Sequence, residues 1–197
     1  MQVNIDNGLM HGVRQVASPN HDLRPSGVDA DLIVVHGISL PPGEFGGHWI
    51  ERLFTNSLPA EVHPYFAEVG GRRVSAHLVV SRDGEVTQYV SFTHRAWHAG
   101  ESIYEGRKAC NDFSVGVELE GTDTLPYEEA QYRALAKIVA ALCAAYPLMS
   151  ADRLVGHSDI APGRKTDPGP AFDWPHARRL IARACGRPTL GSPRRQS

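Results

Sequence analysis

The chain has 197 residues, of which 42% are hydrophobic, and its 20 Lys and Arg residues nearly balance 22 Asp and Glu residues. This length fits one domain of ordinary size, and the hydrophobic fraction is high enough for a buried core, which excludes a disordered protein. The formal net charge of −2 provides no basic surface for nucleic acid or for an anionic membrane. We therefore expect neither partner.

The cysteines and the first residues of the chain indicate a cytoplasmic protein. Three cysteines are an odd number, and no two of them have the spacing of a zinc ribbon or a redox pair. The N-terminus lacks the basic and apolar regions of a signal peptide, and no apolar run approaches the ~20 residues that span a bilayer. We expect a cytoplasmic monomer.

The first predicted strand is a continuous apolar run. Residues 1–31 before it are mixed and polar. Residues 32–35 are typical of a central strand that is buried on both faces, and His36 ends it. A Pro/Gly-rich loop follows over residues 39–47, and a short helix is expected over residues 49–54.

Two further strands are predicted over residues 74–80 and 85–92. The Asp83-Gly84 pair between them is a hairpin turn signal, so the two strands should be antiparallel neighbours. Residues 101–112 are polar and are predicted to form a loop.

The segment 113–119 has the clearest strand alternation in the chain. One face of this strand is apolar and carries Phe113, Val115, Val117 and Leu119. The other face carries Ser114, Gly116, Glu118 and Glu120. Because side chains alternate along a strand, these two sets point in opposite directions.

A long helix is predicted over residues 127–146. Its apolar residues recur at the spacing of a buried stripe: Leu135, Ile138, Val139 and Leu142. Pro126 suits the first turn, and Glu128 and Glu129 complement the positive end of the helix. Pro147 cannot continue the helix and ends it.

The last predicted elements are a short strand over 154–157, a Pro/Gly-rich loop over 158–174 and a helix over 177–185. Strands interleaved with helices indicate an α/β fold, a single domain with a central mixed β-sheet flanked by helices. The domain is predicted to span residues 1–185. Residues 186–197 are rich in Gly, Pro, Ser and Arg and are predicted to be a flexible tail.

Three side chains in this pattern could hold a metal ion. His36 and His157 each end a predicted strand, and Asp167 lies in the loop after the second of these strands. Ligand sites in open α/β sheets form beyond the carboxyl ends of strands. Two histidines and one carboxylate would make a catalytic zinc site with one position left for water. Either histidine alone fits a structural or surface role better, so the hypothesis depends on all three converging.

Glu118 and Lys165 are candidate catalytic residues. A carboxylate beside a zinc site can act as a general base, although Glu118 could instead lie on a solvated strand face. Lys165 precedes Asp167 by two residues, so the two side chains would share a face of an extended segment. A lysine there could stabilise an oxyanion, and the alternative is a solvated loop charge.

Four further residues are candidate substrate contacts. Trp97 and His98 could pack against a sugar or peptide, and Arg73 and Arg107 could clamp carboxylates. Each has a structural alternative, the core for Trp97 and surface ions for the two arginines. His77 is expected to be structural or to support a metal ligand from behind, in preference to being a ligand itself.

Five motifs in the chain follow one another in a recognisable order. They are VVHGISLPPGEFGG at 34–47, RVSAH at 73–77, RAWHAG at 95–100, CNDFSVGVELEGTDTL at 110–125 and GHSDIAPGRKTDPGPAFDW at 156–174. Together they resemble the AmpD family of cytosolic 1,6-anhydro-N-acetylmuramyl-L-alanine amidases, which has the type-2 amidase fold shared with peptidoglycan-recognition proteins. The resemblance extends from about residue 9 to residue 183.

The resemblance implies one zinc ion per chain, held by His36, His157 and Asp167. It also implies that Glu118 is the catalytic acid and base and that Lys165 stabilises the transition state. The residue pattern points to the same five positions, but it also allows structural or solvent-exposed roles for them. The resemblance disfavours those roles.

The activity implied is hydrolysis of the amide bond between the lactyl group of (1,6-anhydro)-N-acetylmuramic acid and L-alanine. The substrate is then a small soluble anhydromuropeptide, met in cytosolic peptidoglycan recycling. In bacteria with an inducible β-lactamase, the reaction also lowers the muropeptide inducer. Two alternatives are a non-catalytic recognition protein, which should lack a metal ligand, and an amidase of the intact wall, which should carry a signal peptide.

Gly37 departs from the family pattern, in which the residue after the first zinc histidine is usually Asn. If that Asn contacts the peptide, this chain lacks the contact. The departure bears on peptide binding and leaves the metal ligands intact.

Overall fold

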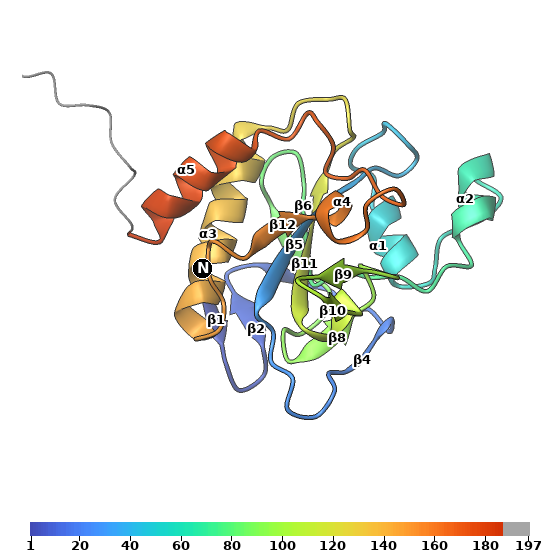
Figure 1. Cartoon of the computed structure of the whole chain (residues 1–197). Helices are drawn as coiled ribbons and strands as arrows, with labels where there is room; N and C mark the ends of the chain where they lie inside the picture. The colour runs from blue at the N-terminus through green and yellow to red at the C-terminus, as the bar shows by residue number, and fades with distance from the viewer. Residues whose placement is uncertain (187–197) are drawn as a thin grey trace, which may run out of the picture.

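A six-stranded mixed sheet lies at the centre of the computed structural model, which describes residues 1–186 (Figure 1). The strand order is β12-β5-β11-β6-β7-β3. The strands are β12 (Leu154–Gly156), β5 (Leu32–Ile38), β11 (Ser114–Glu120), β6 (Leu78–Val80), β7 (Val86–Gln88) and β3 (Arg14–Gln15). The first four are parallel, β7 is antiparallel to β6, and β3 is parallel to β7. The α/β class with a mixed sheet is therefore confirmed.

Helices and three small two-stranded pairs surround this sheet. The helices are α1 (Trp49–Phe54), α2 (Pro64–Val69), α3 (Glu129–Ala145), α4 (His157–Ile160) and α5 (Trp174–Ala184), with a 3₁₀ turn η1 (Cys110–Asp112). The antiparallel pairs are β1 (Gln2–Asn4) with β2 (Leu9–His11), β4 (His21–Leu23) with β8 (His94–Ala96), and β9 (Ile103–Tyr104) with β10 (Arg107–Lys108). No helix among residues 1–186 is both long and apolar enough to cross a membrane.

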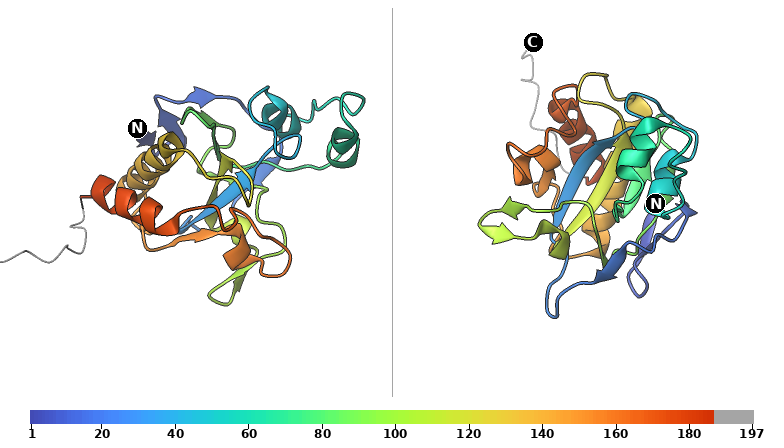
Figure 2. Two further views of the ribbon diagram at one scale, coloured as in Figure 1. Left: turned by 90° about the horizontal axis from the view of Figure 1, so that it is seen from above. Right: turned by 90° about the vertical axis from the view of Figure 1, so that its right-hand side faces the viewer.

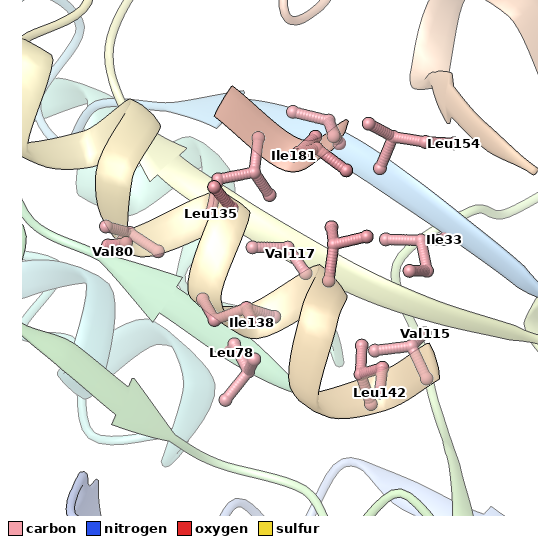
Figure 3. Packing of buried hydrophobic residues seen from close by; sticks show 14 of the residues in the cluster. Ile33, Leu78, Val80, Val115, Val117, Leu135, Ile138, Leu142, Leu154 and Ile181 are labelled. Carbon is pink, nitrogen blue, oxygen red and sulfur yellow. The ribbon is translucent and has the colours of Figure 1, made fainter. Parts of the chain in front are cut away.

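The main core lies between the sheet and the helices α3 and α5, which pack side by side on one of its faces (Figure 2). The four residues of the predicted stripe on α3 are completely buried: Leu135, Ile138, Val139 and Leu142. Figure 3 shows Leu135, Ile138 and Leu142 of this stripe against Ile33 of β5 and Val115 and Val117 of β11. Burying each such side chain stabilises the fold by about 1.5–3 kcal/mol, so this contact fixes α3 on the sheet.

Several predicted boundaries shift in the structure. The helix predicted from residue 127 begins at Glu129, so Pro126 precedes it, and the side-chain oxygen of Gln131 accepts a hydrogen bond from the backbone N–H of Glu128 at 3.0 Å. The hairpin turn is confirmed, but its strands are shorter than predicted because only residues 78–80 and 86–88 pair as a ladder.

Some elements were absent from the sequence prediction. Residues 1–31 contain four short strands, and the predicted loop 101–112 contains the β9–β10 hairpin. These pairs are two or three residues long, too short to show a periodic pattern. The predicted tail, residues 186–197, lies outside the described residues except for Gly186.

Candidate active site

The two strands at the centre of the sheet place one predicted metal ligand, His36, beside the predicted general base, Glu118. β5 and β11 are parallel, and their register pairs His36 directly with Glu118. Both strands continue past these residues, so His36 lies within β5 and does not end it. His157 is the first residue of α4, immediately after β12, and not the end of a strand as predicted.

His36, His157 and Asp167 converge on one point. His36 Nδ1 lies 2.9 Å from His157 Nδ1, and Asp167 Oδ2 lies 3.2 Å from the first and 3.1 Å from the second. Both histidines are buried, and the carboxylate side chain is 16% exposed. Among the described residues these three form a group that could hold a metal ion.

The electrostatics of this group favour metal binding. Burial lowers the pKa of His36 to about 4, so its imidazole is neutral at physiological pH. Burial alone would raise the pKa of Asp167, but the side chains of His157 and His36 in contact with it outweigh burial and hold that pKa well below its usual value. Metal binding requires neutral imidazole and an ionised carboxylate, and His36 and Asp167 are in these states.

Glu118 faces the same point from β11. Its Oε1 lies 4.0 Å from His36 Nδ1, its side chain is 12% exposed, and its Oε2 is buried without a hydrogen-bond partner among the described residues. Burial raises the pKa of Glu118 well above its ordinary value, and the negative charge of Asp167 raises it further. The solvated strand face, considered as an alternative for Glu118, is therefore wrong.

A cavity of about 610 Å³ opens above this group. Its lining includes His36, Glu118, His157, Lys165 and Asp167. The structure thus brings the five predicted metal and catalytic positions together in one cavity, although they come from three separate segments of the chain.

The four predicted substrate contacts divide into two groups. Trp97 and His98 line the cavity, whereas Arg73 is exposed outside its lining. Arg107 pairs with Asp31 at 2.6 Å, and its guanidinium lies 3.7 Å from the ring centre of Phe113. The structure does not bring either arginine to the cavity.

Sequence reasoning missed other cavity residues. Arg72, next to the predicted Arg73, lines the cavity, as do Thr122 and Asp123. The signal available was position in the chain, since residues 122–123 directly follow β11. His77, expected to be structural, is fully buried, and its Nδ1 accepts a hydrogen bond from the backbone of Gly116 at 3.0 Å.

Gly37 lines the cavity opposite a tyrosine. A Cβ atom at this position would lie 2.3 Å from the hydroxyl of Tyr127. That hydroxyl donates a hydrogen bond to the carbonyl of Pro168 at 2.9 Å, next to Asp167. The absence of a side chain at position 37 therefore leaves room for a contact that holds the loop carrying Asp167.

Gly116 provides the space for His98. A Cβ atom at Gly116 would lie 2.5–2.7 Å from three ring atoms of His98, closer than real contacts allow. The ring cannot easily retreat, because its Nδ1 lies 2.9 Å from His36 Nε2 and its Nε2 lies 3.2 Å from Ser114 Oγ. Gly116 and His98 are therefore tightly packed against each other, next to His36.

We expect Gly116→Ala to lower the free energy of unfolding by about 1–3 kcal/mol, the usual cost of forcing a methyl group into a packed core. Urea unfolding measures the change. Gly71→Ala is the matched control, because nothing lies within 4 Å of a Cβ atom at that exposed position. Equal stability of the two variants would show that His98 has room to move.

Comparison with known proteins agrees with this geometry. The profile of the N-acetylmuramoyl-L-alanine amidase family Amidase_2 matches residues 26–170. The 1,6-anhydro-N-acetylmuramyl-L-alanine amidase AmpD of Salmonella typhimurium (strain SL1344) is 58% identical over 177 residues, 90% of this chain and 94% of the relative.

Solved structures show the same fold. A crystal structure of a selenomethionine derivative of AmpD superposes with a TM-score of 0.88 at 54% identity, covering 92% of this chain and 99% of the other. The Escherichia coli amidase AmiD, in complex with the substrate anhydro-N-acetylmuramic acid-L-Ala-D-γ-Glu-L-Lys, superposes with a TM-score of 0.57 at 26% identity, covering 87% of this chain and 64% of the other. With its fold, its converging side chains and its high identity over nearly the whole length, this chain belongs to the N-acetylmuramoyl-L-alanine amidase family.

Proposed function

We propose that this protein is a zinc-dependent amidase that cleaves the bond between the lactyl group of 1,6-anhydro-N-acetylmuramic acid and L-alanine in soluble muropeptides. The observation that carries the proposal is the convergence of His36, His157 and Asp167 on one point, beside the buried Glu118 Oε2 that has no hydrogen-bond partner among residues 1–186. A non-catalytic recognition protein would have no use for this complete set.

Zinc fits the three donor atoms. Ligand atoms about 2.0–2.2 Å from a tetrahedral zinc ion lie about 3.3–3.6 Å apart. The separations of 2.9–3.2 Å among the two Nδ1 atoms and Oδ2 are within a few tenths of an ångström of that spacing. When bound, zinc supplies Lewis-acid chemistry, lowering the pKa of a water molecule to about 7 and polarising a carbonyl group.

Glu118 is the proton carrier of the proposed reaction. Its carboxylate accepts a proton from the attacking water and then donates it to the nitrogen of the departing L-alanine. A raised pKa suits both tasks, because it makes the carboxylate a stronger base and lets the acid persist near neutral pH.

Lys165 is the proposed source of positive charge for the transition state. Lys165 is exposed and lines the cavity. Its positive charge lowers the pKa of Glu118 and so opposes the effect of burial. Lys165 is therefore close enough to interact electrostatically with the reacting groups. In the proposed mechanism it stabilises the oxyanion that develops when water adds to the lactyl carbonyl.

The substrate proposal rests on cavity size and on the relatives. A volume of about 610 Å³ is in the usual range for a small-ligand site. The AmpD relative is named for the anhydro sugar, and the AmiD complex contains an anhydromuramyl peptide. We place the reaction in cytoplasmic recycling of peptidoglycan fragments, where it would also lower a muropeptide inducer of β-lactamase. Trp97 is the proposed contact for the sugar or peptide, whereas Arg73 and Arg107 lie outside the cavity lining and are no longer proposed as contacts for peptide carboxylates.

We expect the protein to hydrolyse anhydromuramyl-tripeptide with a higher kcat/KM than either the reduced muropeptide or purified sacculi. A cavity of this size accommodates a fragment and excludes a polymer strand. The three rates are measured side by side with zinc-loaded protein. Comparable kcat/KM on all three would mean that only the lactyl–alanine bond is recognised, and the recycling role would lose its support.

A further inference from the structure

We propose that Asn111 is a positioning residue for the metal centre, acting through residues 98–99, which hold the outer nitrogens of both metal-binding histidines. The inference rests on the proposed function, since it concerns the same metal. Asn111 itself is not among the residues that line the cavity. It lies in η1, which ends two residues before β11 begins at Ser114.

The side chain of Asn111 holds the backbone of two consecutive residues. Its Oδ1 accepts hydrogen bonds from the backbone N–H of His98 at 3.1 Å and from that of Ala99 at 2.8 Å. Residues 98–99 follow β8 and belong to no strand, so no ladder of backbone hydrogen bonds positions them. The side-chain oxygen of Asn111 instead accepts the two backbone hydrogen bonds of this segment.

Each of these two residues offers an acceptor to a different metal-binding histidine. His157 Nε2–H donates to the carbonyl of Ala99 at 3.1 Å. His36 Nε2 lies 2.9 Å from His98 Nδ1. The segment that Asn111 holds therefore contacts both histidines on the side away from the metal point.

A chain of hydrogen bonds sets the direction of the second contact. The hydroxyl of Ser114 donates to the carbonyl of Cys110 at 2.6 Å, so its oxygen accepts from His98 Nε2–H at 3.2 Å. His98 Nδ1 then has no proton and accepts from His36 Nε2–H. This leaves the lone pair of His36 Nδ1 directed at His157 and Asp167, as a metal ligand requires.

A further donor supports the same carbonyl from the solvent side. Arg164 donates to the carbonyl of Ala99 at 2.6 Å and to that of Glu101 at 2.6 Å. A carbonyl oxygen has two lone pairs, so the contacts from Arg164 and His157 are compatible. Arg164 fixes one acceptor, whereas Asn111 fixes the segment that carries both.

This arrangement revises the prediction that His98 is a substrate contact. Both ring nitrogens are used within the protein, toward His36 and Ser114, and the ring face fills the space over Gly116. We assign His98 to the support of His36. The expected loss on disturbing such outer partners is about 10–100-fold in metal affinity.

The test is the zinc affinity of the full chain, measured by competition with a chromogenic chelator. We expect Asn111→Ala to weaken zinc binding about 10–100-fold. Asn111→Asp, which keeps an oxygen acceptor at the same position, should stay within about threefold of the unsubstituted protein. Circular dichroism verifies that each variant is folded.

The outcomes separate the two proposals. If the unsubstituted protein binds no zinc, the proposed function fails. If it binds one zinc and the folded Asn111→Ala variant binds it equally well, the role of Asn111 is refuted. If Asn111→Ala does not fold, long-range ¹H–¹⁵N correlation spectra of the unsubstituted metal-free protein decide. A proton on Nδ1 of His36 or His157 would overturn the inference, and protons on Nε2 of both would support it.

Discussion

Replacing His36 by alanine is expected to remove both the bound zinc and the activity. His36 supplies one of the three ligand atoms that converge on the metal point, and it is buried at the centre of the sheet. Loss of a ligand should exceed the ~10–100-fold in affinity that loss of an outer partner costs. Metal analysis after gel filtration and a hydrolysis assay on anhydromuramyl-tripeptide measure the two effects.

His11→Ala is the matched control for this prediction. His11 is an exposed histidine at the end of β2 on the small N-terminal strand pair. It should keep one zinc per chain and full activity. A His36→Ala protein that retains close to one zinc per chain would contradict the proposed ligand set.

Replacing Glu118 by glutamine is expected to lower kcat by about 10²–10⁴-fold while zinc remains bound. Glutamine has nearly the same shape but cannot accept and return a proton. Because Glu118 Oε1 lies 4.0 Å from His36 Nδ1 and is not one of the three converging ligand atoms, the metal should stay. Steady-state kinetics and metal analysis of the same preparation test both parts of the prediction.

The same substitution carries an expectation for stability. Glu118 Oε2 is buried without a hydrogen-bond partner among residues 1–186, and a buried carboxylate without a partner lowers the stability of a fold. Glu118→Gln should therefore have a Tm equal to or higher than that of the unsubstituted protein. Such a gain is expected where a residue needed for activity lowers the stability of the fold. Glu61→Gln, at an exposed position, is the control and should change neither Tm nor kcat. Full activity in folded, zinc-loaded Glu118→Gln would disprove its role as proton carrier.

The sequence by itself determined the elements that have strong local patterns. The apolar run of β5, the alternation of β11 and the buried stripe of α3 all appear where the residue pattern predicts them, and the helix 49–54 has the predicted bounds. Periodicity identifies such segments because one face of each must be buried whatever it packs against. The candidate ligands were recognisable because they lie near the ends of predicted strands, in distinctive motifs.

Only the tertiary structure decided what each polar residue on those elements does. The alternation of β11 left Glu118 equally compatible with solvent, until the register with β5 placed it beside His36. His98 has the chemistry of a substrate contact, and only the structure shows that Gly116 and Ser114 of β11 lie against its ring. Burial and hydrogen-bond partners depend on residues far apart in the chain, here 16 to 131 positions from one another, and no local pattern contains that information.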